Sequence, residues 1–155
     1  MLDIQDPIEA RKVIRSNDYT EQTAGSANKY VQGNICILPS KYAMDFASFC
    51  QKNPKPCPLI GFGTKGDPSL KDLGDIDIRT DVPQYRVWEK GKIIDEPYDI
   101  KKYWNEDLTT FVLGCSMSFE FNGRIDTTSF PENWPAGSQS IDVRYIGTIV
   151  LFSIC

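Results

Sequence analysis

The chain has 155 residues, a hydrophobic fraction of 41% and a formal net charge of −4, which together predict one globular domain with a buried core. The acidic balance and the dispersed Lys and Arg argue against a nucleic-acid partner, and the most apolar segment, residues 145–155, is shorter than the roughly 20 residues of a membrane-spanning helix. Histidine is absent, which excludes Ser-His-Asp and Cys-His catalysis within this chain and leaves acid–base chemistry to Asp, Glu, Cys, Tyr or Lys.

The N-terminus has no apolar signal segment, and the acids Asp3, Asp6 and Glu9 do not fit a transit peptide. The five cysteines are an odd set without a CxxC pair, which is typical of reduced thiols. Their spacing offers no all-cysteine zinc site. We therefore expect an intracellular protein without a metal centre.

A helix is predicted to begin at DPIE, residues 6–9. Asp6 can cap it, Pro7 suits the first helical position, and Glu9 has the capping-box spacing, and such a cap is worth about 1 kcal/mol. The helix should end at residues 16–18. Its apolar face is expected to consist of Ile8, Val13 and Ile14.

Small residues at positions 23–27 predict a loop, followed by a strand over residues 30–38 in which Gly33 indicates a bulge or a close backbone approach. A helix is predicted over residues 40–52. Its apolar face would consist of Tyr42, Ala43, Phe46, Phe49 and Cys50. The three prolines of NPKPCPL, residues 53–59, end this helix and favour extended geometry.

The segment GFGTKG, residues 61–66, predicts a loop but lacks the GK[ST] of a phosphate-binding loop. In DIDIRTDVP, residues 75–83, isoleucine alternates with charged residues, which indicates a half-buried strand. The next segment, YRVWEKGKIIDEP, predicts a hairpin that turns near Lys90 and Gly91.

Two helices are expected next, a short one capped by Asp99 in DIKKYW and a longer one over DLTTFVLGCSMSFE, residues 107–120. In the longer helix, Ser116 and Glu120 would lie four residues apart on one stripe. The following residues are loop-like, and residues 144–155 form a final β-prone segment.

Four blocks in order, TAGSANKYVQGNICILP, DFASFCQKNPKPCPLI, DIRTDVPQYRVW and DLTTFVLGCSMSFE, resemble the D-glutamate cyclase family. That family includes bacterial hydro-lyases and the module of animal D-glutamate cyclase. The resemblance covers residues 8–120. It implies a lyase that closes D-glutamate to 5-oxo-D-proline with loss of water, needs no cofactor, and acts in the cytoplasm or the mitochondrial matrix. The expected partner is a small amino-acid substrate, with no nucleic acid and no membrane, and a homo-oligomer is compatible with the sequence.

Residues 121–155 show no such resemblance, which divides the chain into residues 1–120, a hydro-lyase-like N-terminal part, and residues 121–155, a divergent segment. Our hypothesis is that the divergent segment arises from an alternative exon, a frame error or a truncated gene. The fold class expected is α+β, a mixed sheet with flanking helices, as an incomplete version of a larger two-part α/β module. The alternative to an active hydro-lyase is a truncated, inactive remnant or binding module of the same family.

The first site candidates are Arg79, Asp81 and Arg86, because a substrate with two carboxylates requires fixed cations and arginine binds carboxylate with two parallel hydrogen bonds. Asp81 is a candidate catalytic group, and the two arginines are candidate substrate ligands. The alternative is an Arg79–Asp81 surface ion pair, worth roughly 0–1 kcal/mol.

Glu120 and Ser116 are candidate catalytic residues, since a buried carboxyl can exchange protons and a nearby hydroxyl can donate to a carboxylate. Ser118 is a candidate substrate ligand, whereas Cys115 fits a packed core better than a site. The remaining candidate substrate ligands lie on the loops and strand of the earlier blocks: Thr23, Gln32, Asn53 and Lys55. Each of the four also fits an ordinary structural role.

A metal site is suggested by three nearby carboxylates, those of Asp75, Asp77 and Asp81. However, DIDIRTD lacks the central Gly and the final Glu of a calcium-binding loop.

Overall fold

The computed structural model describes residues 4–19, 23 and 30–114, and the backbone of residues 145–150. Its helices are α1 (Pro7–Arg15) and α2 (Ala43–Lys52), and three short 3-10 helices span Ser40–Tyr42, Lys71–Leu73 and Lys101–Tyr103. The strands are β1 (Gln32–Pro39), β2 (Leu59–Phe62), β3 (Arg86–Glu89), β4 (Lys92–Asp95), β5 (Leu108–Gly114) and β6 (Tyr145–Val150). The predicted α+β class is confirmed. Within these residues, no helix is both long and apolar enough to cross a bilayer.

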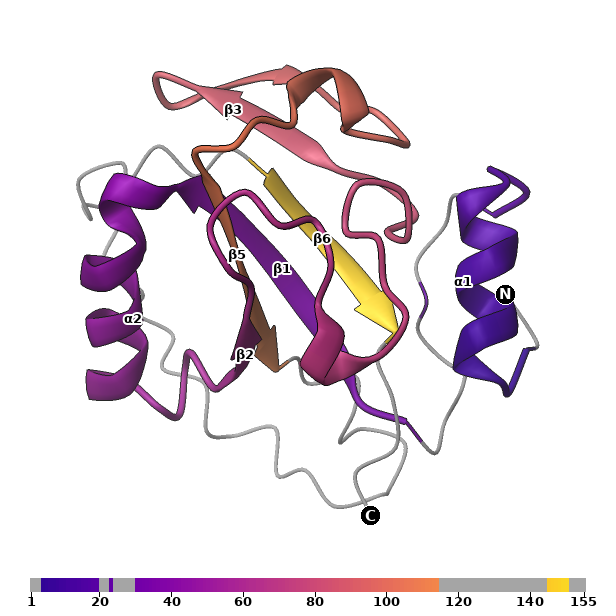
Figure 1. Ribbon diagram of the computed structural model, residues 1–155, viewed down its shortest axis with the longest axis horizontal. Coiled ribbons are helices and arrows are strands. Elements are labelled where there is room, and N and C mark those ends of the chain that lie inside the picture. Colours follow the sequence, from indigo (N-terminus) through magenta and orange to yellow (C-terminus); the bar gives the residue numbers. More distant parts are fainter. Residues whose placement is uncertain (1–3, 20–22, 24–29, 115–144, 151–155) are drawn as a thin grey trace.

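The strands form one sheet in the order β2-β5-β1-β6-β3-β4 (Figure 1). β1 lies inside it, between β5, where Gly33 is opposite Gly114, and β6, where Gln32 is opposite Val150. Every pairing described is antiparallel, so the parallel pairs that a mixed sheet requires are absent from the described strands. β2 and β4 are the two edge strands, so each has one side without a partner among the described strands.

The sheet separates two hydrophobic clusters, because alternate residues of β1 and β5 point to opposite faces. On one face, Ile35 and Val112 pack under the long connection between β2 and β3, which crosses in front of the sheet in Figure 1. On the other face, Cys36 and Phe111 pack with Phe46 of α2. β1 and β5 are therefore buried on both faces, which hides the period-2 alternation of a strand.

Three predictions based on local chemistry are confirmed. Asp6 caps α1 by accepting a hydrogen bond from the Ile8 amide at 2.8 Å. The hairpin turns at Lys90 and Gly91, with φ of 48° and 74°, the left-handed pair that a two-residue type I′ turn requires. The carboxylate of Asp99 accepts from the Lys101 amide at 3.0 Å and so starts the third 3-10 helix.

The predicted helix over residues 107–120 is wrong where the structure describes it, because Leu108–Gly114 is strand β5. Its apolar residues matched helical spacing only because both faces of this strand are buried. The threonines and Val112 are β-branched and favour a strand in this setting. Residues 115–120 lie outside the described part.

The predicted strand over residues 75–83 is also wrong. Asp77 forms only an isolated bridge with Ser69, and the chain then turns, with the amides of Thr80 and Asp81 both donating to the Asp77 carbonyl at 3.0 Å. The Asp77 side chain accepts from the Arg79 amide at 3.0 Å, a local bond that competes with strand pairing. The alternation itself is real, since Ile76 and Ile78 are both buried.

Three smaller expectations also fail. Ile8 is 50% exposed, whereas Ile14 is buried as predicted, and α1 also buries Ala10 and Arg11. Of the two alternatives for Gly33, the bulge is wrong, because Gly33 sits in regular register in both of its pairings. The proline segment turns rather than extends, since the Cys57 amide donates to the Asn53 carbonyl at 3.0 Å.

The buried thiols predict a loss of stability at alkaline pH. Burial, assisted by the neighbouring Cys50 and Cys57, raises the pKa of Cys36 to about 12. This folded-state pKa lies above the unfolded value of about 8.5, so the stabilisation is fully present below pH ~8.5 and is lost as pH rises towards 12. We expect urea unfolding free energies to fall more steeply between pH 8.5 and 10.5 in the wild type than in Cys36→Ala. Equal slopes in the two proteins would contradict this assignment.

Candidate functional site

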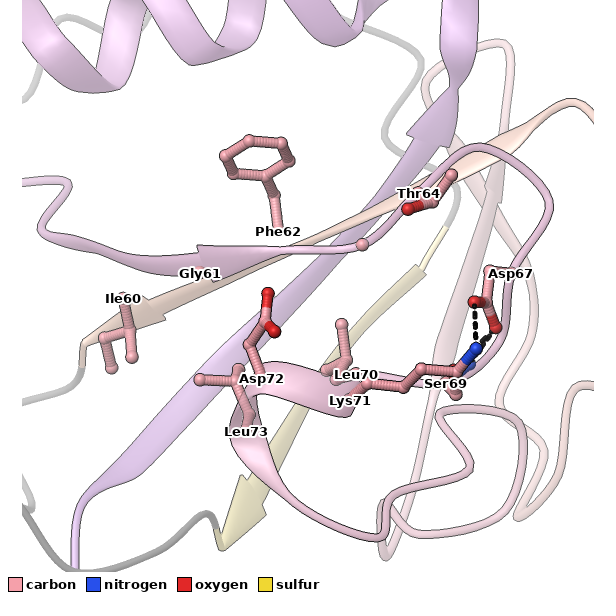
Figure 2. A pocket seen from close by; sticks show the side chains of 11 residues that line it. Ile60, Gly61, Phe62, Thr64, Asp67, Ser69, Leu70, Lys71, Asp72 and Leu73 are labelled. Carbon is pink, nitrogen blue, oxygen red and sulfur yellow. Dashed lines mark hydrogen bonds and ion pairs between the residues drawn. The ribbon is translucent and has the colours of Figure 1, made fainter.

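A groove of about 440 Å³ lies between β2 and the segment that ends in the 3-10 helix Lys71–Leu73 (Figure 2). Its wall includes apolar Ile60 and Leu70 beside polar Thr64 and Asp72. Asp67 accepts from the amide of Ser69 at 2.8 Å and from its hydroxyl at 2.7 Å, and these two hydrogen bonds lower the pKa of Asp67. Sequence reasoning missed this groove, since GFGTKG matched no ligand motif.

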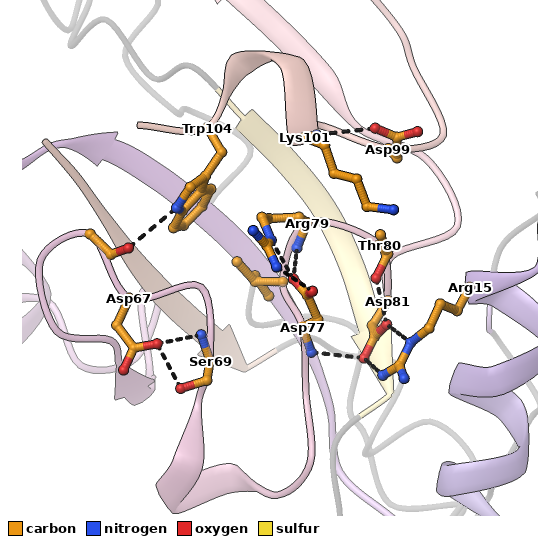
Figure 3. Close-up of polar contacts among 12 residues, drawn as sticks. Arg15, Asp67, Ser69, Asp77, Arg79, Thr80, Asp81, Asp99, Lys101 and Trp104 are labelled. Atoms are coloured by element: carbon orange, nitrogen blue, oxygen red, sulfur yellow. Dashed lines mark hydrogen bonds and ion pairs between the residues drawn. The ribbon is translucent and has the colours of Figure 1, made fainter. Parts of the chain in front are cut away.

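The second feature is the turn of residues 77–81, where two carboxylates and an arginine meet (Figure 3). Arg79 donates to Asp77 through Nε at 2.9 Å and Nη2 at 2.8 Å, so the bidentate pair forms within the turn itself. The predicted alternative pair, Arg79–Asp81, is not formed. The amide of Asp77 instead donates to Asp81 Oδ2 at 2.9 Å.

Asp81 is fully buried and is held mainly by a residue that lies 66 positions away. Arg15, in the last turn of α1, donates from Nε to Oδ1 and from Nη2 to Oδ2, both at 2.7 Å. The Thr80 hydroxyl adds a bond to Oδ1 at 3.0 Å. With the Asp77 amide, four donors occupy the four lone-pair positions of the carboxylate. In this geometry Asp81 anchors α1 and orients Arg15, and it has no free lone pair for a substrate.

The charges at the turn hold one another in their ionised forms. A hydrogen bond to Asp81 raises the pKa of Arg15, and one to Asp77 raises the pKa of Arg79. Burial raises the pKa of Asp77, but the side-chain and backbone hydrogen bonds of Arg79 and its charge outweigh burial, so the net shift is downward. Arg11, one turn before Arg15, is buried, and burial lowers its pKa. The negative charges of Asp81 and Asp75 raise the pKa of Arg11, but they do not outweigh burial.

Among the described residues, two partly exposed guanidinium groups, those of Arg15 and Arg79, keep donors without a partner. Arg15 and Arg79 each bond their carboxylate through Nε and Nη2, and the described residues provide no partner for Nη1 of either side chain. Their side chains are 42% and 34% exposed. Each arginine is thus pre-oriented by an acid and still presents donors to solvent, an arrangement that suits a carboxylate ligand.

Two of the predicted ligands, Thr23 and Gln32, bond to each other. The Thr23 hydroxyl donates to Gln32 Oε1 at 2.9 Å, and Gln32 Nε2 donates to the Thr23 carbonyl at 3.2 Å. Both side chains are buried, so this pair fixes the chain that enters β1. Asn53 closes the C-terminal end of α2 by donating to the Phe49 carbonyl at 2.8 Å, while Lys55 is exposed on the following turn.

Arg86 is exposed at the start of β3 and donates to Glu96 at 2.8 Å across the hairpin. It lines a hollow of about 110 Å³ with Gln84, Tyr85 and Glu96 rather than the turn of residues 77–81. Cys115, Ser116, Ser118 and Glu120 lie outside the described residues. The structure therefore brings together two pairs from the predicted set, Arg79 with Asp81 in one turn and Thr23 with Gln32 at the start of β1. The roles of all the candidates stay predictions.

Sequence reasoning missed Arg11 and Arg15. Both lie on α1 with a spacing of four residues, the spacing that places two side chains on one helix face. The spacing could have indicated that the two arginines act together, but charged residues on a short helix are ordinarily solvated. Only the fold shows that this face of α1 meets Asp81.

Comparison with known proteins places the chain among bacterial homologues, although no family model matches it. Over 120 residues it is 92% identical to a protein of Pelagibacter ubique named "Putative hydro-lyase", which covers 77% of this chain and 46% of that relative. Proteins of the same name from Azorhizobium caulinodans and Rhizobium johnstonii are 56% and 53% identical over 113 and 115 residues, or 42% and 43% of their lengths. The chain thus spans less than half the length of the curated relatives it matches.

Proposed function

We propose that this chain carries the substrate-carboxylate site of a hydro-lyase. Over about three quarters of its length, the chain belongs to the N-terminal portion of the hydro-lyase family. The observation that supports this most is the pair of acid-oriented arginines, Arg15 and Arg79, each with donors left over. The relatives' shared name supports elimination or addition of water as the reaction type.

We further propose D-glutamate as substrate and 5-oxo-D-proline as product, on the resemblance of the four sequence blocks. The amine nitrogen attacks the side-chain carboxyl carbon, a C–N bond forms, and a C–O bond breaks. Two protons of the ammonium group leave with the departing oxygen as water, so the reaction needs no oxidant and no net proton. Arg79 and Arg15 would bind the carboxylates, with Asp81 positioning Arg15. Glu120 and Ser116 remain the proposed proton-transfer groups, and Arg86 a proposed further ligand.

The test is a proton NMR assay of D-glutamate conversion by this chain and, in parallel, by the full-length Pelagibacter relative, with L-glutamate as the stereochemical control. We expect 5-oxoproline from D-glutamate in the full-length relative. Arg79→Ala and Arg86→Ala, at the aligned positions, are expected to abolish turnover without unfolding the protein. Lys12→Gln is the matched control, because Lys12 pairs with Glu9 on the solvent side of α1 at 2.7 Å. Unchanged kinetics for Arg79→Ala would remove Arg79 from the site.

The second candidate function is a non-catalytic binding module of the same family, favoured by the chain covering only 46% of the Pelagibacter relative. Saturation-transfer NMR with D-glutamate separates the two. Binding without product in this chain, beside turnover in the full-length relative, would support the binding module. Product from this chain above the uncatalysed rate would support a catalytic site within it.

A further inference from the structure

We propose that the edge formed by β2 and the adjoining side of α2 is the surface on which the second half of a full-length hydro-lyase of this family packs. The surface, which we name the aromatic edge, consists of Phe49 and Phe62 with the backbone of β2 between Leu59 and Phe62. The occupant is the part of the family chain outside the matched region, because the match covers only 46% of the Pelagibacter relative.

The first argument is a row of four phenylalanine rings that runs from the core to the surface. The Phe46 ring meets the buried Phe111 ring edge-on at 5.0 Å, and the Phe62 ring stacks with the Phe111 ring at 6.1 Å. Phe49 stacks on Phe46 at 6.4 Å. The two ends of this row are open, since Phe62 is 64% exposed and Phe49 is 41% exposed. Figure 2 shows the Phe62 ring standing up from β2 on the side of α2.

The second argument is the register irregularity in β2. The pairing with β5 shifts between Leu59 and Gly61, so the strand does not alternate regularly. Leu59 packs against the α2 cluster and Ile60 against the opposite cluster. A Cβ at Gly61 would lie 3.1 Å from Leu73, again on that opposite side. The shift therefore places Phe62 on the α2 side, where it is exposed, and bulges that redirect a side chain in this way are usually functional features.

The third argument compares the two edges of the sheet. Natural edge strands are ordinarily protected by charged side chains, which prevent pairing with other chains. β4 fits that rule, because Lys92 and Asp95 lie on it and Asp95 is bridged by Lys102 at 2.9 Å. β2 has the sequence LIGF and carries no charge. An uncharged edge with an exposed aromatic ring is suited to a permanent apolar neighbour rather than to water.

The fourth argument is proximity along the chain. The Gly114 amide donates to the Pro58 carbonyl at 2.8 Å, so β5 reaches its last residue beside the residue that precedes β2. In a full-length relative, the polypeptide that follows β5 starts next to the aromatic edge. The groove of about 440 Å³ on the other side of β2 would be bordered by the same neighbour.

Hydrogen–deuterium exchange measured by mass spectrometry tests the proposal on this chain and on the full-length Pelagibacter relative. We expect amides of residues 59–62 to exchange at least about tenfold more slowly in the relative, while amides of β4, residues 92–95, exchange equally in both. Equal exchange at residues 59–62 would overturn the proposal. The amides to compare are those not bonded to β5, and Gly63 is left out because its amide already donates to the Thr110 carbonyl at 2.8 Å. Slow exchange of these outward amides already in this chain would also overturn the proposal, because the chain's own residues or a second copy would then cover the edge.

A pair of substitutions gives an independent readout. Phe62→Asp, at the aligned position, is expected to lower the melting temperature of the relative by about 5 °C or more, because a charge would be buried in the interface. In this chain the same change should leave the melting temperature within about 2 °C, since surface substitutions rarely matter. The matched control, Ile94→Asp on the exposed face of β4, should be neutral in both proteins. Similar shifts for Phe62→Asp in both proteins would count against the proposal, and neither readout depends on the substrate.

Discussion

Replacing Asp81 by alanine is expected to lower the free energy of unfolding by about 3 kcal/mol, because it removes one partner of a buried ion pair and leaves the other uncompensated. Asp81 is fully buried and accepts four hydrogen bonds, two of them from Arg15 at 2.7 Å. The change also leaves the Thr80 hydroxyl and the Asp77 amide without their acceptor, because both donate to Asp81. The value lies at the low end for buried pairs because Arg15 is 42% exposed and regains water.

The measurement is urea unfolding followed by circular dichroism, with a melting curve beside it. For a chain of this size, 3 kcal/mol corresponds to a fall in melting temperature of about 6–12 °C. Asp81→Asn keeps the shape and removes the charge, so it should fall between the wild type and Asp81→Ala. Glu96→Ala is the control, because its pair with Arg86 is exposed and worth about 0–1 kcal/mol. A loss from Asp81→Ala no larger than that from Glu96→Ala would show that the pair does not hold α1 in place.

Elements whose signals are local could be predicted from the sequence. The cap of α1 depends on Asp6 and Pro7, and the hairpin depends on a glycine that tolerates positive φ at position 91. These interactions connect residues within a few positions, so neighbouring residues in the sequence contain the information. The resemblance of the four blocks to the hydro-lyases is confirmed by the homologues, because it rests on residue identity rather than on packing.

Elements defined by tertiary packing could not be predicted in the same way. β5 is covered on one face by α2 and on the other by the connection between β2 and β3, so successive residues are buried. The resulting run of apolar residues resembles helical spacing in the sequence. The alternating pattern around Asp77 predicts a strand, but in the structure the Asp77 side chain accepts a hydrogen bond from the Arg79 amide and the chain turns there. The sequence was right that Ile76 and Ile78 are buried, but burial alone does not fix the backbone.

The candidate site shows the same division. Arg79 and Asp81 were predicted as neighbours in sequence, and the structure places them in one turn, but each bonds to a different partner. The partner of Asp81 is Arg15, on another element, and no spacing rule connects positions 15 and 81. A site assembled across elements requires the fold, and here the fold adds a second oriented arginine to the one that the sequence suggested.

Replacing Phe111 by alanine is expected to cost about 3–5 kcal/mol, the range for deleting a buried aromatic ring from a close-packed core. Phe111 is 1% exposed and lies in β5, opposite Cys36 of β1 and opposite Phe62 of β2. Its ring meets Phe46 edge-on at 5.0 Å, a geometry that adds about 0.5–1.5 kcal/mol beyond the area buried.

Phe62→Ala is the matched control, because the same ring is removed from the neighbouring strand, where it is 64% exposed. We expect it to change the free energy of unfolding by less than about 1 kcal/mol, with an unchanged urea dependence. Equal losses for the two variants would mean that Phe62 is packed as deeply as Phe111. That result would contradict both the open aromatic edge and the docking surface inferred from it. A large loss confined to Phe111 would instead show that the row of rings is anchored in the core of this half and leaves its outer end free.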